Sequence, residues 1–240
     1  MNIFGSILKN TLPQKDAENL FSKFEKKSFS QSGEDLIIDF IFNALGISRP
    51  SYIDIGAHHP YYLNNTAIFY LRGARGINIE PDPSLFSLFL NHRKEDTNLN
   101  IGISDTLGTL DFHVMNIPTL NTFSAEEADK YSLEGDYYIK EIKKINVEPI
   151  SKVISDFKNG VFPDFLTLDA EGIDEIVLKS IDYDNNKPIV ICTETISFSE
   201  KGKGVKNVEI IQFLESNGYM LYADTHINSI FVEKNRWVRN

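Results

Sequence analysis

The feature that most constrains the fold is an alternation of short apolar segments with amphipathic helical patterns along the 240 residues. The apolar segments have the length of strands, and helical patterns lie between most of them. Such alternation is typical of βαβ units, which build a parallel sheet through right-handed crossovers. The predicted strands are residues 52–55, 76–80, 98–104, 164–169 and 188–194, and the predicted helices are residues 64–72, 83–92, 173–181 and 205–217.

Two regions depart from this alternation. Residues 218–234 hold two strand-like runs around a polar turn, which predicts a hairpin. Residues 108–150 hold a predicted strand pair, 109–115 and 142–149, around a polar stretch that contains tyrosines. An insertion of this length inside a compact domain is often a lid or a substrate loop, and the alternative is a surface loop without a function.

The N-terminal part of the chain predicts a helical extension over residues 1–50, ahead of a main domain over residues 51–240. A polar amphipathic helix is expected over residues 16–27. A second helix is expected after Ser32, because Ser32 and Asp35 have the spacing of a capping box. Its apolar stripe is predicted from Leu36, Ile37, Phe40, Ile41 and Ala44.

Charge and cysteine content exclude several classes of function. The net charge of −10 argues against nonspecific binding to nucleic acid or to an anionic membrane. Cys192 is the single cysteine, which excludes an internal disulfide and a cysteine-based zinc site, and its apolar neighbours predict a buried thiol. Arg72, Arg75 and Arg93 are expected in solvent at the ends of helices and strands. We find no apolar run that would span a membrane and no signal-peptide core, so we expect a cytoplasmic protein.

Acidic residues stand at the predicted carboxyl ends of three successive strands. Asp54 ends the first strand, Glu80 ends the second, and Ser104 and Asp105 follow the third. Ligands of doubly wound sheets bind at these ends, where a carboxylate can accept hydrogen bonds from ribose hydroxyls or from an adenine amine. Each acidic residue alone could be a helix cap or a solvated side chain, so the inference depends on the ordered set.

The turn after the first strand, 54-DIGAHHP-60, has one glycine only. A pyrophosphate needs close backbone approach at a helix N-terminus, which a glycine-rich turn permits. The strand ends therefore offer negative charge without a phosphate cradle. This combination favours a cationic adenosine ligand, and S-adenosyl-L-methionine has that chemistry.

Five segments together resemble the FkbM-type S-adenosylmethionine-dependent methyltransferases. The resemblance covers residues 28–233 and depends on the order of the whole set. It implies the class I methyltransferase fold, an α/β sandwich of three layers around a mostly parallel seven-stranded sheet with an antiparallel last strand. It also implies O-methylation of a hydroxyl on a sugar, a glycan or another natural product. The segments are 29-FSQSGEDL-36, 52-YIDIGAHHPYYLNNT-66, 76-GINIEPDP-83, 98-NLNIGIS-104 and 166-LTLDAEG-172.

The resemblance assigns roles by position. It makes 54-DIGAHH-59 the cofactor loop and Glu80 the ribose acceptor, and 30-SQSGED-35 closes over the methionine end. His58 stands where many members have asparagine, which leaves the path of this loop open. With the strand-end argument, the predicted cofactor contacts are Gln31, Asp35, Asp54, Gly56, Ala57, His58, Glu80, Ser104, Asp105 and Asp169.

Methyl transfer is an in-line displacement, so the protein must align the nucleophile and exclude water. A sugar hydroxyl is a poor nucleophile and gains from a general base. The predicted catalytic residues are Asp169, Glu171 and His59, with His226 as a further candidate. No metal is expected; if one is used, Asp169 and Glu194 are the predicted oxygen ligands.

Two other functions remain open at this level. A nicotinamide-dependent sugar oxidoreductase would need the phosphate cradle that the first turn lacks. A non-catalytic module would keep the fold and the cofactor affinity without methyl transfer. The expected partner is a small-molecule or glycan acceptor and not a nucleic acid. The sequence names neither the acceptor nor the oligomeric state, a homo-oligomer included.

Overall fold

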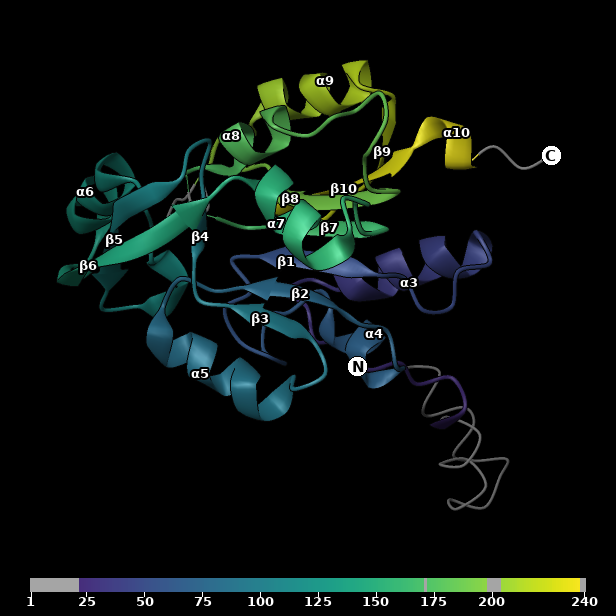
Figure 1. The fold of residues 1–240 in the computed structure, drawn as a ribbon, viewed down its shortest axis with the longest axis horizontal. Coiled ribbons are helices and arrows are strands. Elements are labelled where there is room, and N and C mark those ends of the chain that lie inside the picture. Colours follow the sequence, from purple (N-terminus) through teal and green to yellow (C-terminus); the bar gives the residue numbers. More distant parts are fainter. Residues whose placement is uncertain (1–21, 171, 198–203, 238–240) are drawn as a thin grey trace, which may run out of the picture.

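The computed structural model describes residues 22–170, 172–197 and 204–237, and a seven-stranded sheet forms its centre (Figure 1). The strand order is β3-β2-β1-β7-β8-β10-β9, and every pair is parallel except those of β10, which runs antiparallel to β8 and β9. This arrangement confirms the predicted class I methyltransferase fold. The strands are β1 (Tyr52–Ile55), β2 (Gly76–Ile79), β3 (Thr97–Leu99), β7 (Phe165–Leu168), β8 (Val190–Glu194), β9 (Tyr219–Asp224) and β10 (Asn228–Glu233).

Helices cover both faces of this sheet, each over its own apolar cluster (Figure 1). One face packs against α7 (Ile150–Lys158), α8 (Asp174–Lys179) and α9 (Val208–Ser216). The other face packs against α3 (Glu34–Ala44) and α4 (Ala67–Leu71), while α5 (Pro83–His92) lies beside β3 and α10 (Lys234–Trp237) follows β10. No helix of the described residues is long and apolar enough to cross a membrane.

The strands β1, β2 and β7 are buried along their whole length, as expected for parallel strands that are covered on both faces. Their register places Ile55 level with Ile79 and with Leu168. The residues that follow, Gly56, Glu80 and Asp169, therefore meet at one edge of the sheet. The predicted convergence of the strand ends follows directly from this register.

The insertion folds as a small unit beside the main sheet. The strands β4 (Gly102–Ile103), β5 (Gly108–Met115) and β6 (Ile139–Glu148) form a second sheet in the order β4-β6-β5. This confirms the predicted strand pair. The 3₁₀ helix η1 (Pro118–Leu120) and α6 (Ala125–Glu134) pack on it around Met115 and Tyr131. The predicted strand 98–104 is wrong as one element, because the chain leaves the main sheet after Leu99 and enters this second sheet at Gly102.

The helix α3 begins differently from the prediction. Its N-cap is Gly33, which has a φ of 91° and no side-chain cap, so the predicted capping box at Ser32 is wrong. Its buried apolar residues are Ile38, Ile41 and Phe42, whereas the predicted Phe40 is 54% exposed. Asp39 is also buried on this face, where it forms an ion pair with Arg72. The helix predicted over residues 16–27 lies largely outside the described residues.

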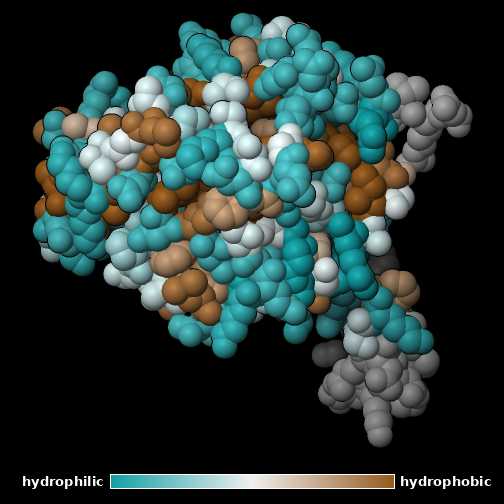
Figure 2. All heavy atoms as spheres, viewed as in Figure 1, coloured by the Kyte–Doolittle hydropathy of each residue, from teal (hydrophilic) through white to brown (hydrophobic). Residues whose placement is uncertain are grey.

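The surface is mainly hydrophilic on the face that Figure 2 shows, with hydrophobic residues scattered among polar ones. The net charge of −10 fits such a surface.

Candidate functional site

A cavity of about 520 Å³ opens at the carboxyl ends of β1, β2, β7 and β8. Its floor comes from these strand ends, and further walls come from the insertion and from the turn between β9 and β10. Of the ten predicted cofactor contacts, the residues that line the cavity are Gln31, Asp54, Gly56, Ala57, His58, Glu80 and Asp169. Asp35, Ser104 and Asp105 are not among its lining residues.

Asp54 is buried beneath the cofactor loop. Its Oδ2 atom accepts hydrogen bonds from Asn64 Nδ2 at 3.0 Å and from Thr66 Oγ1 at 2.8 Å. Burial raises the pKa of this carboxyl to about 6, although the bond from Thr66 and the charge of Arg93 act in the opposite direction. Both bonds end on the same oxygen, so Oδ1 makes no contact to either partner.

Glu80 is the most enclosed carboxylate of the site. Its Oε2 atom accepts from the backbone N–H of His58 at 2.8 Å, and its Oε1 atom accepts from the backbone N–H of Asp82 at 2.7 Å. These bonds tie the cofactor loop to the start of α5. Burial nevertheless raises the pKa of Glu80 to about 8, because the two amides only partly offset the lost solvation.

Gly56 allows the ends of β1 and β7 to approach each other at the cavity floor. Its φ is 76°, which favours glycine. A β carbon at this position would overlap the backbone oxygen of Asp169. The single glycine of the turn is thus required by packing as well as by backbone conformation.

Asp169 is exposed to the cavity, and the described residues provide no hydrogen bond to its carboxylate. Desolvation by the surrounding protein, together with the charges of Asp174 and Asp54, raises its pKa to about 7. An unpaired carboxylate with such a pKa can take up a proton near neutral pH. Glu171, the other predicted acidic catalytic residue, lies outside the described residues.

The two histidines of the cofactor loop differ in position. His58 has a φ of 53°, a left-handed conformation that is uncommon outside glycine, and it lines the cavity. His59 is not among the lining residues, because its ring turns back onto the loop and Nδ1 accepts the N–H groups of Tyr61 and Tyr62. Burial lowers the pKa of both imidazoles. This geometry gives the predicted catalytic role of His59 no support.

The other predicted contacts are held away from the cavity. Asp35 accepts the backbone N–H of Phe29 and the hydroxyls of Ser28 and Ser30, which shapes the loop that presents Gln31 to the cavity. Ser104 donates its backbone N–H to Glu148 O within the insertion's sheet. The adenine contact predicted for Ser104 and Asp105 therefore has no support from the geometry.

Arg93 is a component of the site that the sequence did not predict, and its expected place in solvent is wrong. The side chain is fully buried and forms an ion pair with Asp96. It also donates to Tyr52 Oη, to Thr66 Oγ1 and to the backbone oxygen of Pro60. The guanidinium thereby connects the first strand to the far end of the cofactor loop.

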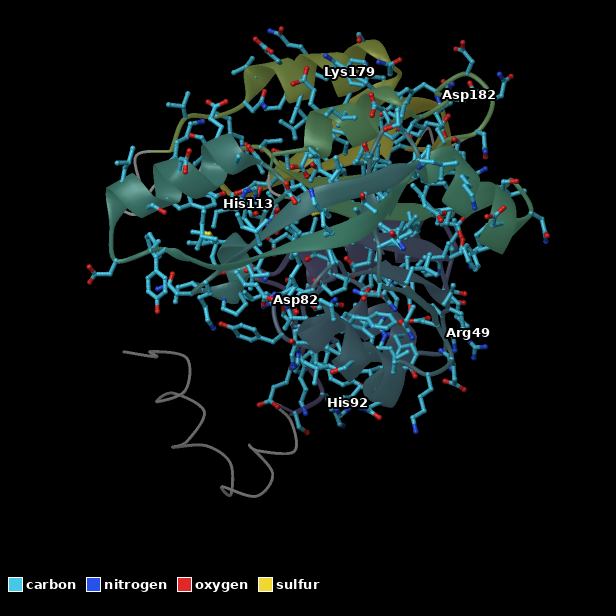
Figure 3. The ribbon with its side chains drawn as sticks, turned by 60° about the vertical axis from the view of Figure 1, so that its left-hand side comes forward. Arg49, Asp82, His92, His113, Lys179 and Asp182 are labelled. Atoms are coloured by element: carbon cyan, nitrogen blue, oxygen red, sulfur yellow. The ribbon has the colours of Figure 1, made fainter. Side chains whose placement is uncertain are left out.

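The insertion contributes a wall through Phe112, Leu120, Asn121 and Phe123. Asn121 Nδ2 donates to Asp82 Oδ2 at 3.2 Å, so the insertion is joined to the start of α5 next to Glu80. Figure 3 shows Asp82 where α5 meets the insertion and His92 at the other end of that helix. No sequence signal marks Asn121 for this role.

The cavity is acidic. Asp54, Glu80, Asp169 and Glu194 line it, and no lysine or arginine does so among the residues that the structure describes. Within the same residues, no three histidine, cysteine, aspartate or glutamate side chains gather as metal ligands. Such a lining attracts a cationic ligand and repels a phosphate.

The raised pKa values predict that the protein loses stability as the pH rises from 5 to 8. The carboxyls of Asp54, Asp169 and Glu80 bind protons more tightly in the folded chain, with pKa values near 6, 7 and 8 against ordinary values of 3.8 and 4.5. Between those limits the folded state carries more protons, so rising pH favours unfolding. Scanning fluorimetry of the ligand-free protein should show the Tm falling across this range.

A Glu80→Gln variant provides the control for this pH dependence. It is less stable than the wild type at pH 5, because one amide oxygen cannot accept both backbone N–H groups. Its Tm should nevertheless fall less steeply between pH 5 and pH 8, since residue 80 no longer titrates. Parallel slopes for the two proteins would contradict the assignment to Glu80.

Solved structures of methyltransferases are similar to this chain at low sequence identity. A Staphylococcus aureus structure described as "a putative caffeoyl-CoA O-methyltransferase" has 8% sequence identity and a TM-score of 0.46, over 96% of this chain and 97% of that one. The Burkholderia thailandensis 1,6-didemethyltoxoflavin-N1-methyltransferase, solved with S-adenosylhomocysteine, has 10% identity and a TM-score of 0.40, over 91% and 81%. No curated protein matches the chain.

A protein family also matches this chain. The family described as Methyltransferase FkbM domain matches residues 54–221, which include both the strand ends of the cavity and the whole insertion. The match covers most of the chain. The chain therefore belongs to the FkbM methyltransferase family.

Proposed function

We propose that this chain transfers a methyl group from S-adenosyl-L-methionine to a hydroxyl of a sugar, a glycan or another natural product. The observation that carries the proposal is the convergence of Asp54, Glu80 and Asp169 on one cavity whose described lining has no cationic side chain. A ligand with a sulfonium, a ribose diol and no phosphate matches this lining. A nicotinamide dinucleotide carries a pyrophosphate and does not.

The chain's residues would hold the cofactor in order along the strand ends. Glu80 retains lone pairs beside its two amide bonds and can accept the ribose hydroxyls. Asp54 lies one strand further along and would provide negative charge near the sulfonium of the bound cofactor. Gly56 and Ala57 bring the backbone to the cavity floor, and Gln31 lines the same space.

Asp169 is the proposed proton acceptor. The bound cofactor supplies the methyl group on a sulfonium, which is already a strong electrophile. Asp169 faces the cavity without a hydrogen-bond partner among the described residues, and its pKa of about 7 suits a base that must first be deprotonated near neutral pH. Its carboxylate accepts the hydroxyl proton while the apolar wall of the insertion limits water.

An Asp54→Asn substitution tests the cofactor assignment by calorimetry at pH 8, where Asp54 is ionised. Because both bonds to Asp54 end on Oδ2, the asparagine oxygen can keep them while the charge is lost. Affinity for S-adenosylmethionine should fall about tenfold, and affinity for S-adenosylhomocysteine, which lacks the sulfonium, by less than about threefold.

Asp105→Asn is the matched control, because it removes a carboxylate that does not line the cavity. Its affinities for both ligands should equal those of the wild type. Equal losses for the two ligands in Asp54→Asn would contradict the electrostatic role of Asp54. A wild-type protein that binds neither ligand would overturn the proposed function.

A further inference from the structure

The turn between β9 and β10 holds His226 in a strained conformation at the edge of the cavity. His226 has a φ of 78°, it is exposed, and it lines the cavity. Among residues with a β carbon, asparagine, aspartate and histidine adopt this conformation more often than most. Such strain persists only where the surroundings fix the backbone, and it concentrates at functional sites.

Four hydrogen bonds hold this turn in place. The backbone N–H of His226 donates to Asp224 Oδ1 at 2.7 Å. Lys206 Nζ donates to the backbone oxygen of His226 at 2.9 Å and to Asp224 Oδ1 at 2.8 Å. Thr225 Oγ1 donates to Glu34 Oε1 at 2.7 Å.

Glu34, which lies near the other end of the described chain, anchors this turn. It is fully buried in the first turn of α3, and it also accepts from Asn228 Nδ2 at 3.2 Å and from the backbone N–H of Ser32 at 2.7 Å. One carboxylate therefore joins the turn that carries His226 to the loop that carries Gln31. Both of these residues line the cavity.

The position of His226 places it away from the cofactor's ribose. Glu80 follows β2, whereas the His226 turn precedes β10, and four strand spacings separate β2 from β10. At the usual spacing this is roughly 19 Å. Asp169, the proposed base, follows β7 between the two ends. The end of the cavity over β8 and β10 is therefore the side that an acceptor would occupy.

Resting on the proposed function, we infer that His226 contacts the methyl acceptor and that Thr225 and Glu34 position it. A neutral imidazole offers one hydrogen-bond donor and one acceptor, which matches a hydroxyl that both donates and accepts. Glu194 and Asn228 line the same end, and the carboxylates of Glu194 and Asp169 favour hydroxyl donors over an anionic group. The chemistry of this subsite therefore fits an uncharged hydroxylated ligand.

A His226→Asn substitution tests the contact, because asparagine tolerates the left-handed backbone and removes the imidazole. The probes are methyl α-D-glucopyranoside, methyl α-D-mannopyranoside and methyl α-L-rhamnopyranoside. Their binding is measured by saturation-transfer NMR on the protein with S-adenosylhomocysteine bound. At least one probe should bind the wild type, and His226→Asn should bind it about tenfold more weakly. Calorimetry should show unchanged affinity for S-adenosylhomocysteine.

Three further variants separate contact from folding. Thr225→Val, which loses the bond to Glu34, should weaken the probe, and Thr225→Ser should restore it. His92→Asn replaces a histidine that does not line the cavity and should bind the probe as the wild type does. Wild-type affinity in His226→Asn, or no bound probe in the wild type, would overturn the inference. Absence of S-adenosylhomocysteine binding would instead overturn the proposed function.

Discussion

At pH 9, where Glu80 with its pKa of about 8 is ionised, Glu80→Gln should weaken the binding of S-adenosylmethionine by about 100-fold, because a buried charged acceptor of two ribose hydroxyls contributes about 3 kcal/mol. The glutamine has one oxygen, which the two backbone N–H groups of His58 and Asp82 already require. The effect should be equally large for S-adenosylhomocysteine and for 5′-methylthioadenosine, since all three ligands carry the same ribose. Calorimetry with the three ligands measures it.

Glu95→Gln is the matched control for this prediction. Glu95 is an exposed carboxylate ahead of β3 that pairs with Arg75 and does not line the cavity, so its loss should leave all three affinities unchanged. A large loss for S-adenosylmethionine alone would assign Glu80 to the sulfonium instead of the ribose. A change below about threefold for all three would remove Glu80 from the cofactor site.

Asp54 and Glu80 could be predicted because their positions depend on local pattern. Each stands at the end of a short apolar strand, and parallel strands bring such ends to one edge of a sheet. The register that pairs Ile55 with Ile79 and Leu168 then brings the residues after these strands together. The fold class and the floor of the cavity could therefore be predicted, because they depend on elements with a strongly periodic sequence.

Ser104 and Asp105 show where that reasoning fails. The same rule was applied to a third strand, but the chain leaves the main sheet after Leu99. Asn100 donates to the backbone oxygens of Glu80 and Pro81, and the next strand pairs with β6 in the insertion. This is a tertiary event between residues far apart in sequence, which no local periodicity reports.

The histidines and the insertion illustrate two other limits. The left-handed backbone of His58 determines that His58 and not His59 lines the cavity. The residue type at position 58 does not by itself predict this backbone conformation. By contrast, α6 had a readable signal that was missed: Ser124 and Glu127 have capping-box spacing, and Ser124 Oγ accepts the N–H of Glu127. The polar composition of the segment concealed the helix.

Arg93→Met should lower the free energy of unfolding by about 3–5 kcal/mol, which is the usual cost of removing one member of a buried ion pair. The substitution removes the counter-charge of the buried Asp96 carboxylate, and it removes the guanidinium donors to the hydroxyls of Tyr52 and Thr66 and to the carbonyl of Pro60. For a chain of this size the Tm should fall by roughly 10 °C. Pro60 directly follows the cofactor loop, and Thr66 donates to Asp54 within it. Affinity for S-adenosylmethionine should therefore fall as well.

The control is Arg75→Met, which breaks an exposed pair with Glu95 and should cost less than about 1 kcal/mol. A second test adds Asp96→Asn to Arg93→Met. The double variant should lose less stability than the two single variants added together, because the unpaired charge is gone. Urea unfolding of the wild type and the four variants measures both effects. If Arg93→Met matched Arg75→Met, the buried pair could not be what holds the cofactor loop to the first strand.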